Sequence, residues 1–594
     1  MGFEPKYRDL IVMFEDSVKK YGDKPFLGTK RGGQYQWITY KEFSKKVDAL
    51  RAALKDLGIA AHDRVAAISN NREEWAIGAF ATEGLGAAYV PMYESQLDKE
   101  WKYILNDSGA KACFVGNKEI FDRVTELKKE LPNLQYVINF EGTADDNTSL
   151  SHLLKAGEGK DVPAHESDGS EVAAIIYTSG TTGNPKGVQL THLNLASNVC
   201  ALQQVVPMIE GEERTLAFLP WAHVFGGFIE LNGLMSKGGS LGLAESVETI
   251  VDNLAEVKPT ILFAVPRIWN RIYGGVQKQI SEKPGIIQKI FEIGMRARSK
   301  QKRGESTSLI EGICLFLAEK LIFKKIVARF GGRLKWAISG AAALSSDVAE
   351  FVDNLGITVF EGYGMTESSG GTTANWPGSN KIGTVGRPIP GVEIKLDHDA
   401  PGGDADNGEI IIYGHGVMKG YYNLPDQTKE TITEDGGLRT GDLGSIDKDG
   451  FLKITGRVKE LYKLENAKYV APAPLEESVT LSQYIAQAMF WGDNKPHNVA
   501  LIVPDFENLT PWCAEHGIDT SSHEAMISDN RVHELIREEL EKYSKEFKGF
   551  ERAREFVVLH EPFSTENDML TPTLKLKRRN VMTQYKSKLE SLYK

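Results

Sequence analysis

The segment from Tyr177 to Gly187 combines glycines, hydroxyl side chains and a lysine in a pattern suited to binding phosphate. It reads Tyr-Thr-Ser-Gly-Thr-Thr-Gly-Asn-Pro-Lys-Gly. Glycine lets a backbone adopt positive φ and come close to a ligand, and the N–H groups and hydroxyls of such a loop can surround phosphate oxygens. Lys186 adds a positive charge. We therefore expect a phosphate-binding loop here rather than a flexible surface turn.

Two familiar nucleotide motifs do not describe this loop. A Walker A motif places its lysine between Gly and Ser or Thr, whereas Lys186 lies between Pro185 and Gly187. The GxGxxG fingerprint of Rossmann domains is also absent from the segment. The loop thus represents another class of phosphate site.

Alternating helical and strand patterns indicate the elements that position this loop. Short apolar runs at 64–69, 88–91, 173–177, 260–265 and 334–339 predict strands, and the spacing of apolar residues at 41–57 and 75–85 predicts helices. This rhythm is typical of an α/β fold with largely parallel sheets. Ligands bind beyond the carboxyl ends of the strands in such sheets, so we expect the site in the loops after the last three strands.

A change of composition near Asp442 predicts a second domain. The stretch 439–456 is rich in Gly and Asp and is interpreted as turns between short strands, and the residues that follow are more highly charged. We predict a large domain over 1–456 and a smaller α+β domain over 457–594. A loop within one domain would also explain the composition.

The loop closely resembles the phosphate-binding loop of the adenylate-forming superfamily, which includes acyl-CoA synthetases, luciferases and the adenylation domains of peptide synthetases. The resemblance implies that ATP binds here. The residues it places at the phosphates are Thr178, Ser179, Gly180, Thr181, Thr182, Gly183 and Lys186, with Thr178 also a Mg²⁺ ligand.

Other segments resemble further motifs of that superfamily, in its order along the chain. Glu-Gly-Tyr-Gly-Met-Thr-Glu-Ser at 361–368 implies that Tyr363 stacks on adenine, Thr366 contacts the α-phosphate and Glu367 binds Mg²⁺. The Ser-Gly-Ala-Ala segment at 339–342 implies that Gly340 lies against the adenine, and His223 falls where the family keeps a residue near the acyl carboxylate. A lone histidine is more often structural.

The remaining motifs lie nearer the C-terminus. Arg-Thr-Gly-Asp-Leu at 439–443 resembles the ribose-binding segment, with Asp442 accepting from the ribose hydroxyls, and Arg457 would be the second ribose contact. Lys459 falls at the family's hinge between the domains. The segment 570–578 resembles the last motif and makes Lys575 the adenylation lysine, although Lys577 and Arg578 lie close by.

The resemblance implies a large N-terminal adenylate-forming domain of α/β layers and a small mobile α+β C-terminal domain. It also implies an enzyme that uses ATP and Mg²⁺ to activate a fatty acid and coenzyme A as co-substrate to accept it. The catalytic residues would be Lys575, Glu367, Thr366 and His223. An acyl-AMP ligase with another acceptor, a ligase for an aryl or medium-chain acid, and a silent nucleotide-binding module are the alternatives.

Three segments favour the long-chain branch of this superfamily. Val265–Ile272 and Leu461–Leu475 resemble motifs of that branch, and 281–335 resembles its insertion. The insertion has thirteen Lys or Arg against five Glu, mixed with apolar residues at helical spacing. A helix with basic and apolar residues mixed in this way can lie on the surface of an anionic membrane. An ordinary surface helix pair fits the pattern equally well.

Composition argues against several other classes of protein. A net charge of −11 and a pI of about 5.7 do not suggest a nucleic-acid partner. Four widely spaced cysteines argue against a disulfide scaffold or a zinc site. The N-terminus has no pattern of a signal peptide, so we expect a cytoplasmic protein, with peripheral membrane contact through 281–335 as one option. No pattern indicates an oligomeric state.

Overall fold

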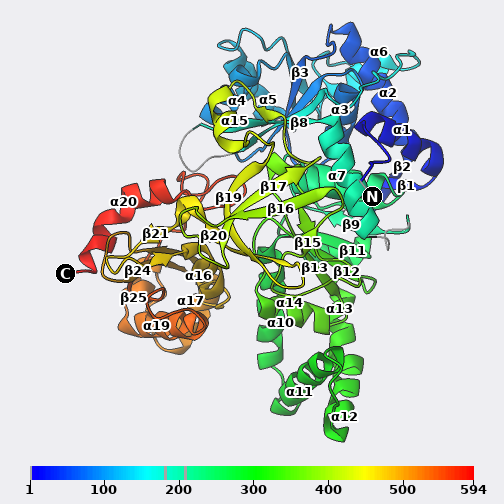
Figure 1. The fold of residues 1–594 in the computed structure, drawn as a ribbon. Coiled ribbons are helices and arrows are strands. Elements are labelled where there is room, and N and C mark those ends of the chain that lie inside the picture. Colours follow the sequence, from blue (N-terminus) through cyan, green and yellow to red (C-terminus); the bar gives the residue numbers. More distant parts are fainter. Residues whose placement is uncertain (1–2, 179–183, 207–210) are drawn as a thin grey trace. The chain divides into compact units, whose positions relative to one another are not determined.

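A computed structural model describes residues 3–178, 184–206 and 211–594 of the chain (Figure 1). The chain forms two compact units. The N-terminal unit comprises Met1–Trp269, Gly275–Ile394 and Ile412–Arg439, and the C-terminal unit comprises Asn270–Gly274, Lys395–Ile411 and Thr440–Lys594. The domain boundary predicted from the sequence, at 456/457, lies later in the chain than Thr440, where the last segment of the C-terminal unit begins. This boundary stays a prediction.

The largest sheet of the N-terminal unit has seven strands in the order β18-β8-β7-β4-β3-β5-β6. The five strands from β7 to β6 run parallel, whereas β8 and β18 pair antiparallel. Every residue of β4 and β5 is buried, which explains the continuous apolar runs. The strands are β3 (Arg64–Ile68), β4 (Ala88–Met92), β5 (Ala112–Val115), β6 (Tyr136–Asn139), β7 (Val172–Thr178), β8 (Lys186–Thr191) and β18 (Gly420–Tyr421).

Two further sheets complete this unit. One has the order β11-β12-β13-β14-β15 and contains β11 (Ile261–Ala264), β12 (Trp336–Ser339), β13 (Thr358–Tyr363), β14 (Thr373–Ala374) and β15 (Arg387–Pro388). The other has the order β2-β1-β10-β9 and contains β1 (Pro25–Arg31), β2 (Gln34–Thr39), β9 (Arg214–Ala217) and β10 (Ser240–Leu243). The carboxyl ends of the parallel strands β11, β12 and β13 lie at one edge of their sheet. The α/β fold expected from the sequence is confirmed.

Local capping explains where several helices begin. The Thr39 hydroxyl accepts from the N–H of Glu42, whose carboxylate accepts from the N–H of Thr39, at the start of α2 (Tyr40–Asp56). Thr191 caps α7 (His192–Val205) in the same way with Asn194. The other helices of the unit outside the insertion are α1 (Leu10–Tyr21), α3 (Glu73–Glu83), α4 (Asp98–Ser108), α5 (Lys118–Lys128), α6 (Leu150–Gly157), η1 (Phe225–Glu230), α8 (Leu231–Met235), α9 (Ile250–Val257), α14 (Ser346–Asn354), η3 (Thr366–Ser368) and α15 (Pro425–Thr431).

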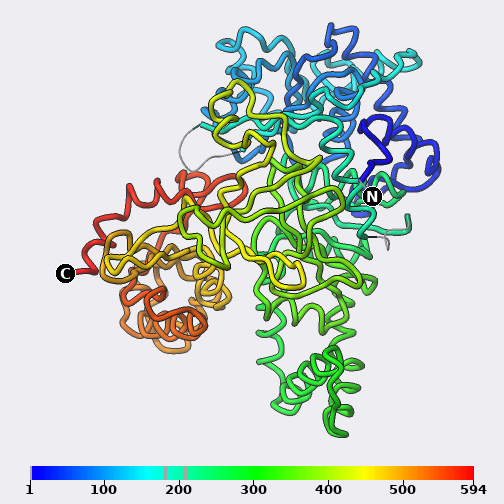
Figure 2. Tube along the Cα trace, in the orientation of Figure 1, coloured from blue at the N-terminus to red at the C-terminus, as the bar shows by residue number. Residues whose placement is uncertain are grey.

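A helical insertion joins β11 to β12 (Figure 2). It contains α10 (Pro266–Ser281), α11 (Gly285–Lys302), α12 (Leu309–Ala318), η2 (Glu319–Phe323) and α13 (Lys324–Arg329). A Cβ on Gly294 of α11 would lie 2.5 Å from the Cβ of Ala318. Only glycine therefore permits this close packing of α11 against α12. We call residues 285–329 the insertion hairpin.

The C-terminal unit has its own core around the three-stranded sheet β23-β24-β25. Its strands and helices are β21 (Tyr462–Lys463), β22 (Tyr469–Val470), β23 (Ile485–Trp491), β24 (Asn498–Pro504), β25 (Ala553–Val558), η4 (Val458–Glu460), α16 (Pro472–Val479), α17 (Phe506–Glu515), α18 (His523–Ile527), α19 (Asn530–Ser544) and α20 (Arg578–Ser591). This mixture agrees with the α+β composition predicted for the smaller domain.

A further sheet, most of which belongs to the C-terminal unit, differs from the sequence prediction. It has the order β16-β17-β19-β20, with β16 (Val392–Asp397), β17 (Gly408–Gly414), β19 (Leu438–Ile446) and β20 (Leu452–Arg457). The stretch 439–456, predicted to form turns between short strands, consists of most of β19, the turn at 447–451 and most of β20, so the strands take up more of it than the turn. A β-bulge after Leu443 and the positive φ of Gly441 accommodate the glycines within a nine-residue strand.

Among the described residues, no helix is long and apolar enough to cross a membrane. The four cysteines are all free thiols, and Cys113, Cys200 and Cys513 are buried.

Candidate active site

The predicted phosphate loop connects two paired antiparallel strands. Thr178 ends β7 and lies opposite Lys186, which begins β8. Ser179, Gly180, Thr181, Thr182 and Gly183 lie outside the described residues. The strand pairing thus holds the two flanking residues of the loop at the carboxyl end of β7.

Lys186 and Glu367 are joined through Tyr421, which the sequence analysis did not single out. The Lys186 ammonium lies 4.8 Å from the centroid of the Tyr421 ring, within cation–π range. The Tyr421 hydroxyl donates to Glu367 Oε1 over 2.9 Å, and this bond is buried. Burial, with the Glu367 carboxylate as a smaller cause, raises the pKa of Tyr421. The hydroxyl therefore stays protonated and acts as a donor.

Backbone contacts orient the short helix η3 that carries Thr366 and Glu367. The Met418 N–H donates to the Glu367 carbonyl over 2.9 Å. Asn198 Nδ2 donates to the carbonyls of Ser368 and Gly371 over 3.3 and 2.6 Å. Both Thr366 and Glu367 are buried. Asn198 and Met418 thus hold the backbone around η3, and Tyr421 holds the Glu367 side chain.

The donor set near Glu367 fits Mg²⁺ bound together with a phosphate ligand. No group of three or more His, Cys, Asp and Glu that could hold a metal occurs in the described part of the chain. Mg²⁺ is usually bound through one or two carboxylates and the phosphates of a substrate, with water completing its shell. A single buried carboxylate such as that of Glu367 matches that mode, whereas a metal cage made of protein alone would need more ligands.

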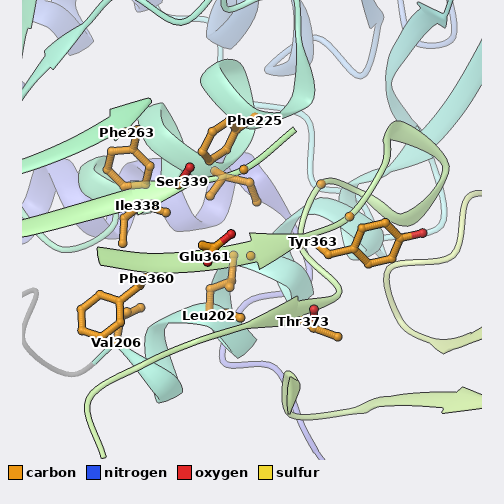
Figure 3. A pocket seen from close by; sticks show the side chains of 18 of the residues that line it. Leu202, Val206, Phe225, Phe263, Ile338, Ser339, Phe360, Glu361, Tyr363 and Thr373 are labelled. Carbon is orange, nitrogen blue, oxygen red and sulfur yellow. The ribbon is translucent and has the colours of Figure 1, made fainter. Parts of the chain in front are cut away.

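Gly340, Tyr363 and His223 line one cavity of the N-terminal unit, which has a volume of about 100 Å³. Figure 3 shows Tyr363 at one side of the view and Phe360 and Val206 at the other. The cavity lies among α7, η1 and the ends of β11, β12 and β13, and its walls include the apolar side chains Val199, Leu202, Val206, Phe225, Ile229, Phe263, Ile338 and Phe360. An apolar cavity with a few polar groups is the usual form of a small-molecule site.

Two of the segments that line this cavity resemble motifs of the sequence analysis, and they carry His223 and Ser339. His223 Nδ1 accepts from the N–H of Phe225 over 3.2 Å, so Nε2 carries the proton in the neutral ring. Ser339 is 1% exposed, and its hydroxyl has no hydrogen-bond partner among the described residues. Ala341 has φ 70°, a strained conformation that is frequent at functional sites.

Glu361 is an acid in this apolar cavity that the sequence analysis did not assign. It is 6% exposed, and its carboxylate accepts from the N–H of Leu344 over 3.3 Å. Burial raises the pKa of Glu361 to about 7, although hydrogen bonds from Leu344 and Gly383 lower it. The residue therefore changes charge near neutral pH.

We expect Glu361 to make the stability of the N-terminal unit depend on pH. Because its pKa is raised on folding, the folded unit binds more protons than the unfolded chain between about pH 4.5 and 7. Its stability should then fall by up to about 3 kcal/mol as pH rises through this window. Glu361→Gln, which mimics the neutral acid, should flatten the pH dependence of the calorimetric transition of this unit. Parallel pH curves for wild type and variant would contradict the assignment.

Asp442 and Arg457 are neighbours in the C-terminal unit. They are register partners in β19 and β20, and Arg457 Nε donates to Asp442 Oδ1 over 2.6 Å. The Asp442 N–H donates to the Thr440 hydroxyl over 3.0 Å, and the carboxylate is largely buried. The structure therefore brings the two predicted ribose contacts together.

Lys459 and Lys575 are both exposed side chains of the C-terminal unit. Lys459 lies in η4, directly after β20. Lys575 lies in a tight turn where the Thr571 N–H donates to the Lys575 carbonyl over 2.8 Å and the Lys575 N–H donates to the Thr571 hydroxyl over 3.0 Å. The turn therefore presents the Lys575 side chain to solvent.

Two neighbouring cations of the basic run form ion pairs within the fold. Lys577 Nζ pairs with Asp568 over 2.6 Å. The Arg578 guanidinium pairs with Glu476 and lies 3.6 Å from Glu460. These ion pairs give Lys577 and Arg578 structural roles, and both side chains are less exposed than that of Lys575.

Solved structures with a similar fold include an adenylation domain and a CoA ligase. The adenylation domain of a carboxylate reductase from Mycobacterium chelonae matches with a TM-score of 0.78 and 24% identity, over 99% of this chain and 92% of that chain. An anthranilate CoA ligase in complex with anthranoyl-AMP matches with a TM-score of 0.75 and 19% identity, over 98% of each chain. The fold is therefore that of the adenylate-forming class.

The chain belongs to the AMP-binding enzyme family. The model of that family matches residues 14–422, and the model of the AMP-binding enzyme C-terminal domain matches residues 460–594. Long chain acyl-CoA synthetase 4 of Arabidopsis thaliana is 32% identical, over 98% of this chain and 91% of the relative. The long-chain-fatty-acid–CoA ligase FadD15 of Mycobacterium bovis is 33% identical, over 94% of this chain and 93% of the relative.

Proposed function

We propose that this protein is a long-chain fatty acid–CoA ligase that forms acyl-CoA, AMP and pyrophosphate from a fatty acid, ATP and coenzyme A. The observation that carries the proposal is the apolar cavity, because Gly340 and Tyr363, which resemble adenine-binding residues, line it together with His223. The apolar lining suits an acyl chain whose carboxylate meets a nucleotide. The nearly full-length similarity to long-chain acyl-CoA synthetases supports the same activity.

The first half-reaction joins the acid to AMP. A carboxylate oxygen attacks the α-phosphorus, a new P–O bond forms, and the P–O bond to pyrophosphate breaks. Both reactants are anionic, so catalysis must mainly offset negative charge. In this proposal Lys186 and Lys575 supply positive charge, the Thr366 hydroxyl donates to the α-phosphate, and His223 Nε2 lies near the carboxylate.

The remaining residues hold the nucleotide. Tyr363 stacks on the adenine beside Gly340, and Asp442 accepts from the ribose hydroxyls next to Arg457. Thr178, Ser179, Gly180, Thr181, Thr182 and Gly183 surround the phosphates. Mg²⁺ would be held by Glu367, Thr178 and phosphate oxygens, and it would neutralise charge on the departing pyrophosphate.

The second half-reaction transfers the acyl group to the thiol of coenzyme A. The thiolate attacks the acyl carbon, and the bond from that carbon to the AMP oxygen breaks. AMP is a good leaving group, so the protein mainly positions the thiol. We propose that the C-terminal domain reorients about Lys459 between the two half-reactions, with the domain boundary at 456/457.

Tyr421 has a positioning role in this account, which Tyr421→Phe tests. The variant keeps the ring under Lys186 but removes the donor to the buried Glu367 carboxylate, and a hydrogen bond to a charged group contributes about 1.5–3 kcal/mol. We expect about tenfold slower adenylation and a higher Mg²⁺ concentration for half-maximal rate. Tyr413→Phe is the matched control, because the Tyr413 hydroxyl donates to Asp435 at the surface over 3.0 Å. An unchanged Mg²⁺ dependence in Tyr421→Phe would count against the role.

An assay of products against a panel of acids tests the proposed function. Purified protein is mixed with ATP, Mg²⁺ and fatty acids from short to long, or aryl acids, with and without coenzyme A. Long-chain acyl-CoA should form only when ATP, acid and coenzyme A are all present. Pyrophosphate without acyl-CoA would indicate an acyl-AMP ligase with another acceptor, and no release with any acid would indicate a binding module.

A reducing compartment such as the cytoplasm is part of the same proposal. The four cysteines are free thiols far apart in the chain, as is usual where disulfides do not persist.

A further inference from the structure

One side of the insertion hairpin exposes large apolar side chains to solvent. Leu309, Ile310, Ile313 and Phe316 of α12 are 82%, 68%, 53% and 59% exposed. Their spacing places them on one side of the helix. The opposite side of α12, including Leu315 and Ala318, is buried.

Exposed cations continue this surface along the same helical rod. Lys320, Lys324, Lys325 and Arg329 follow in η2 and α13 and are all exposed. In the described part of the chain, none of the four forms an ion pair. The Lys320 ammonium lies 5.5 Å from the Phe316 ring centroid, so the cationic and apolar parts are contiguous. We call these eight residues the hairpin face.

The acidic residues of α12 and η2 pair with α11 and so do not offset the charge of the hairpin face. Glu311 pairs with Lys300 over 2.8 Å and lies 3.6 Å from Arg296. Glu319 pairs with Arg298. The hydrogen bond from Lys300 is the main cause that lowers the pKa of Glu311 to about 2, so this carboxylate stays charged.

We infer that the hairpin face binds the surface of an anionic lipid membrane. Apolar side chains beside flexible lysines are suited to the boundary between headgroups and acyl chains. Each lysine or arginine near an anionic leaflet raises the affinity of a protein for the membrane about fivefold. A second copy of the chain is a poorer partner, because a two-fold contact would place the same cations opposite one another.

Vesicle flotation with the full chain, without ATP, acid or coenzyme A, tests the inference. Wild type should float with vesicles of phosphatidylcholine and phosphatidylglycerol, bind phosphatidylcholine alone at least tenfold more weakly, and detach as salt rises. The apolar variant Ile313→Ser/Phe316→Ser should bind at least tenfold more weakly. The charge variant Lys320→Gln/Lys324→Gln/Lys325→Gln should bind on the order of 100-fold more weakly.

Two matched control variants change other exposed side chains. Val247→Ser/Val251→Ser alters exposed valines at and before α9. Lys41→Gln/Lys45→Gln/Lys55→Gln alters exposed lysines of α2. Both should float like wild type.

Several results would overturn the inference. Wild type could fail to bind anionic vesicles, or could bind both vesicle types equally. The control and hairpin variants could lose binding equally. Full competition by soluble polyglutamate would indicate an acidic protein partner. A wild type that dimerises in sedimentation when the apolar variant does not would also overturn it, since the face would then pair with itself. The assay contains no substrates, so its outcome is independent of the proposed ligase activity.

Discussion

Lys575→Ala should slow acyl-adenylate formation by on the order of 100-fold or more. A positively charged group acting on the phosphates in the transition state has no substitute once it is removed, because the neighbouring Lys577 and Arg578 are held in ion pairs. Thioester formation from supplied acyl-adenylate should remain nearly unchanged, since that step forms no new charge on the triphosphate. Rapid-quench measurement of each half-reaction separates the two effects.

Neighbouring variants control for the position of this lysine. Arg579→Ala removes an exposed cation four residues further on, and it should leave both half-reactions at the wild-type rate. Lys575→Arg keeps the charge and should retain part of the adenylation rate. If Arg579→Ala or Lys577→Ala lost adenylation while Lys575→Ala kept it, the assignment of the motif would be shifted along the chain.

Lys459→Pro should give the opposite pattern, with adenylation retained and thioester formation lowered on the order of 100-fold. Proline fixes φ near −65°, which restricts the backbone between β20 and β21 to one conformation. A reaction whose second step needs the C-terminal domain in a new orientation should then stop after the first. Pre-steady-state accumulation of acyl-adenylate in the presence of coenzyme A would report this arrest.

Lys459→Ala is the control for the hinge, because it removes the side chain but keeps backbone freedom. It should accumulate little acyl-adenylate. Equal loss of both half-reactions in Lys459→Pro, with the calorimetric transitions of both units unchanged, would argue against a hinge at this position.

Buried parallel strands were the elements most readily predicted from the sequence. The run at 64–69 became β3 and the run at 173–177 became β7, because a strand covered on both faces leaves a continuous apolar signal. The extent of the strands in 439–456 was harder to predict, since several of its glycines and aspartates lie within β19 and β20 and not in the turn between them. A bulge and a left-handed glycine hold such residues in a strand, and composition does not distinguish this from a loop.

The contacts around Glu367 could not be predicted, because they depend on tertiary pairing. Tyr421 lies 54 residues from Glu367 in the chain and reaches it because β18 pairs with β8. The neutral-pH titration of Glu361 likewise results from burial among apolar side chains, which a single sequence does not display. The resemblance to family motifs therefore supplied the candidate site residues, whereas residues such as Tyr421 that contact them became apparent only from the structure.

The measurement that most directly tests the account is the fate of oxygen-18 from a labelled fatty acid carboxylate. The proposed route makes a bond from a carboxylate oxygen to the α-phosphorus and later breaks the bond from that oxygen to the acyl carbon. Mass spectrometry should therefore find one labelled oxygen in the phosphate of AMP for each acyl-CoA formed. Unlabelled AMP, or label in pyrophosphate, would contradict an acyl-adenylate route.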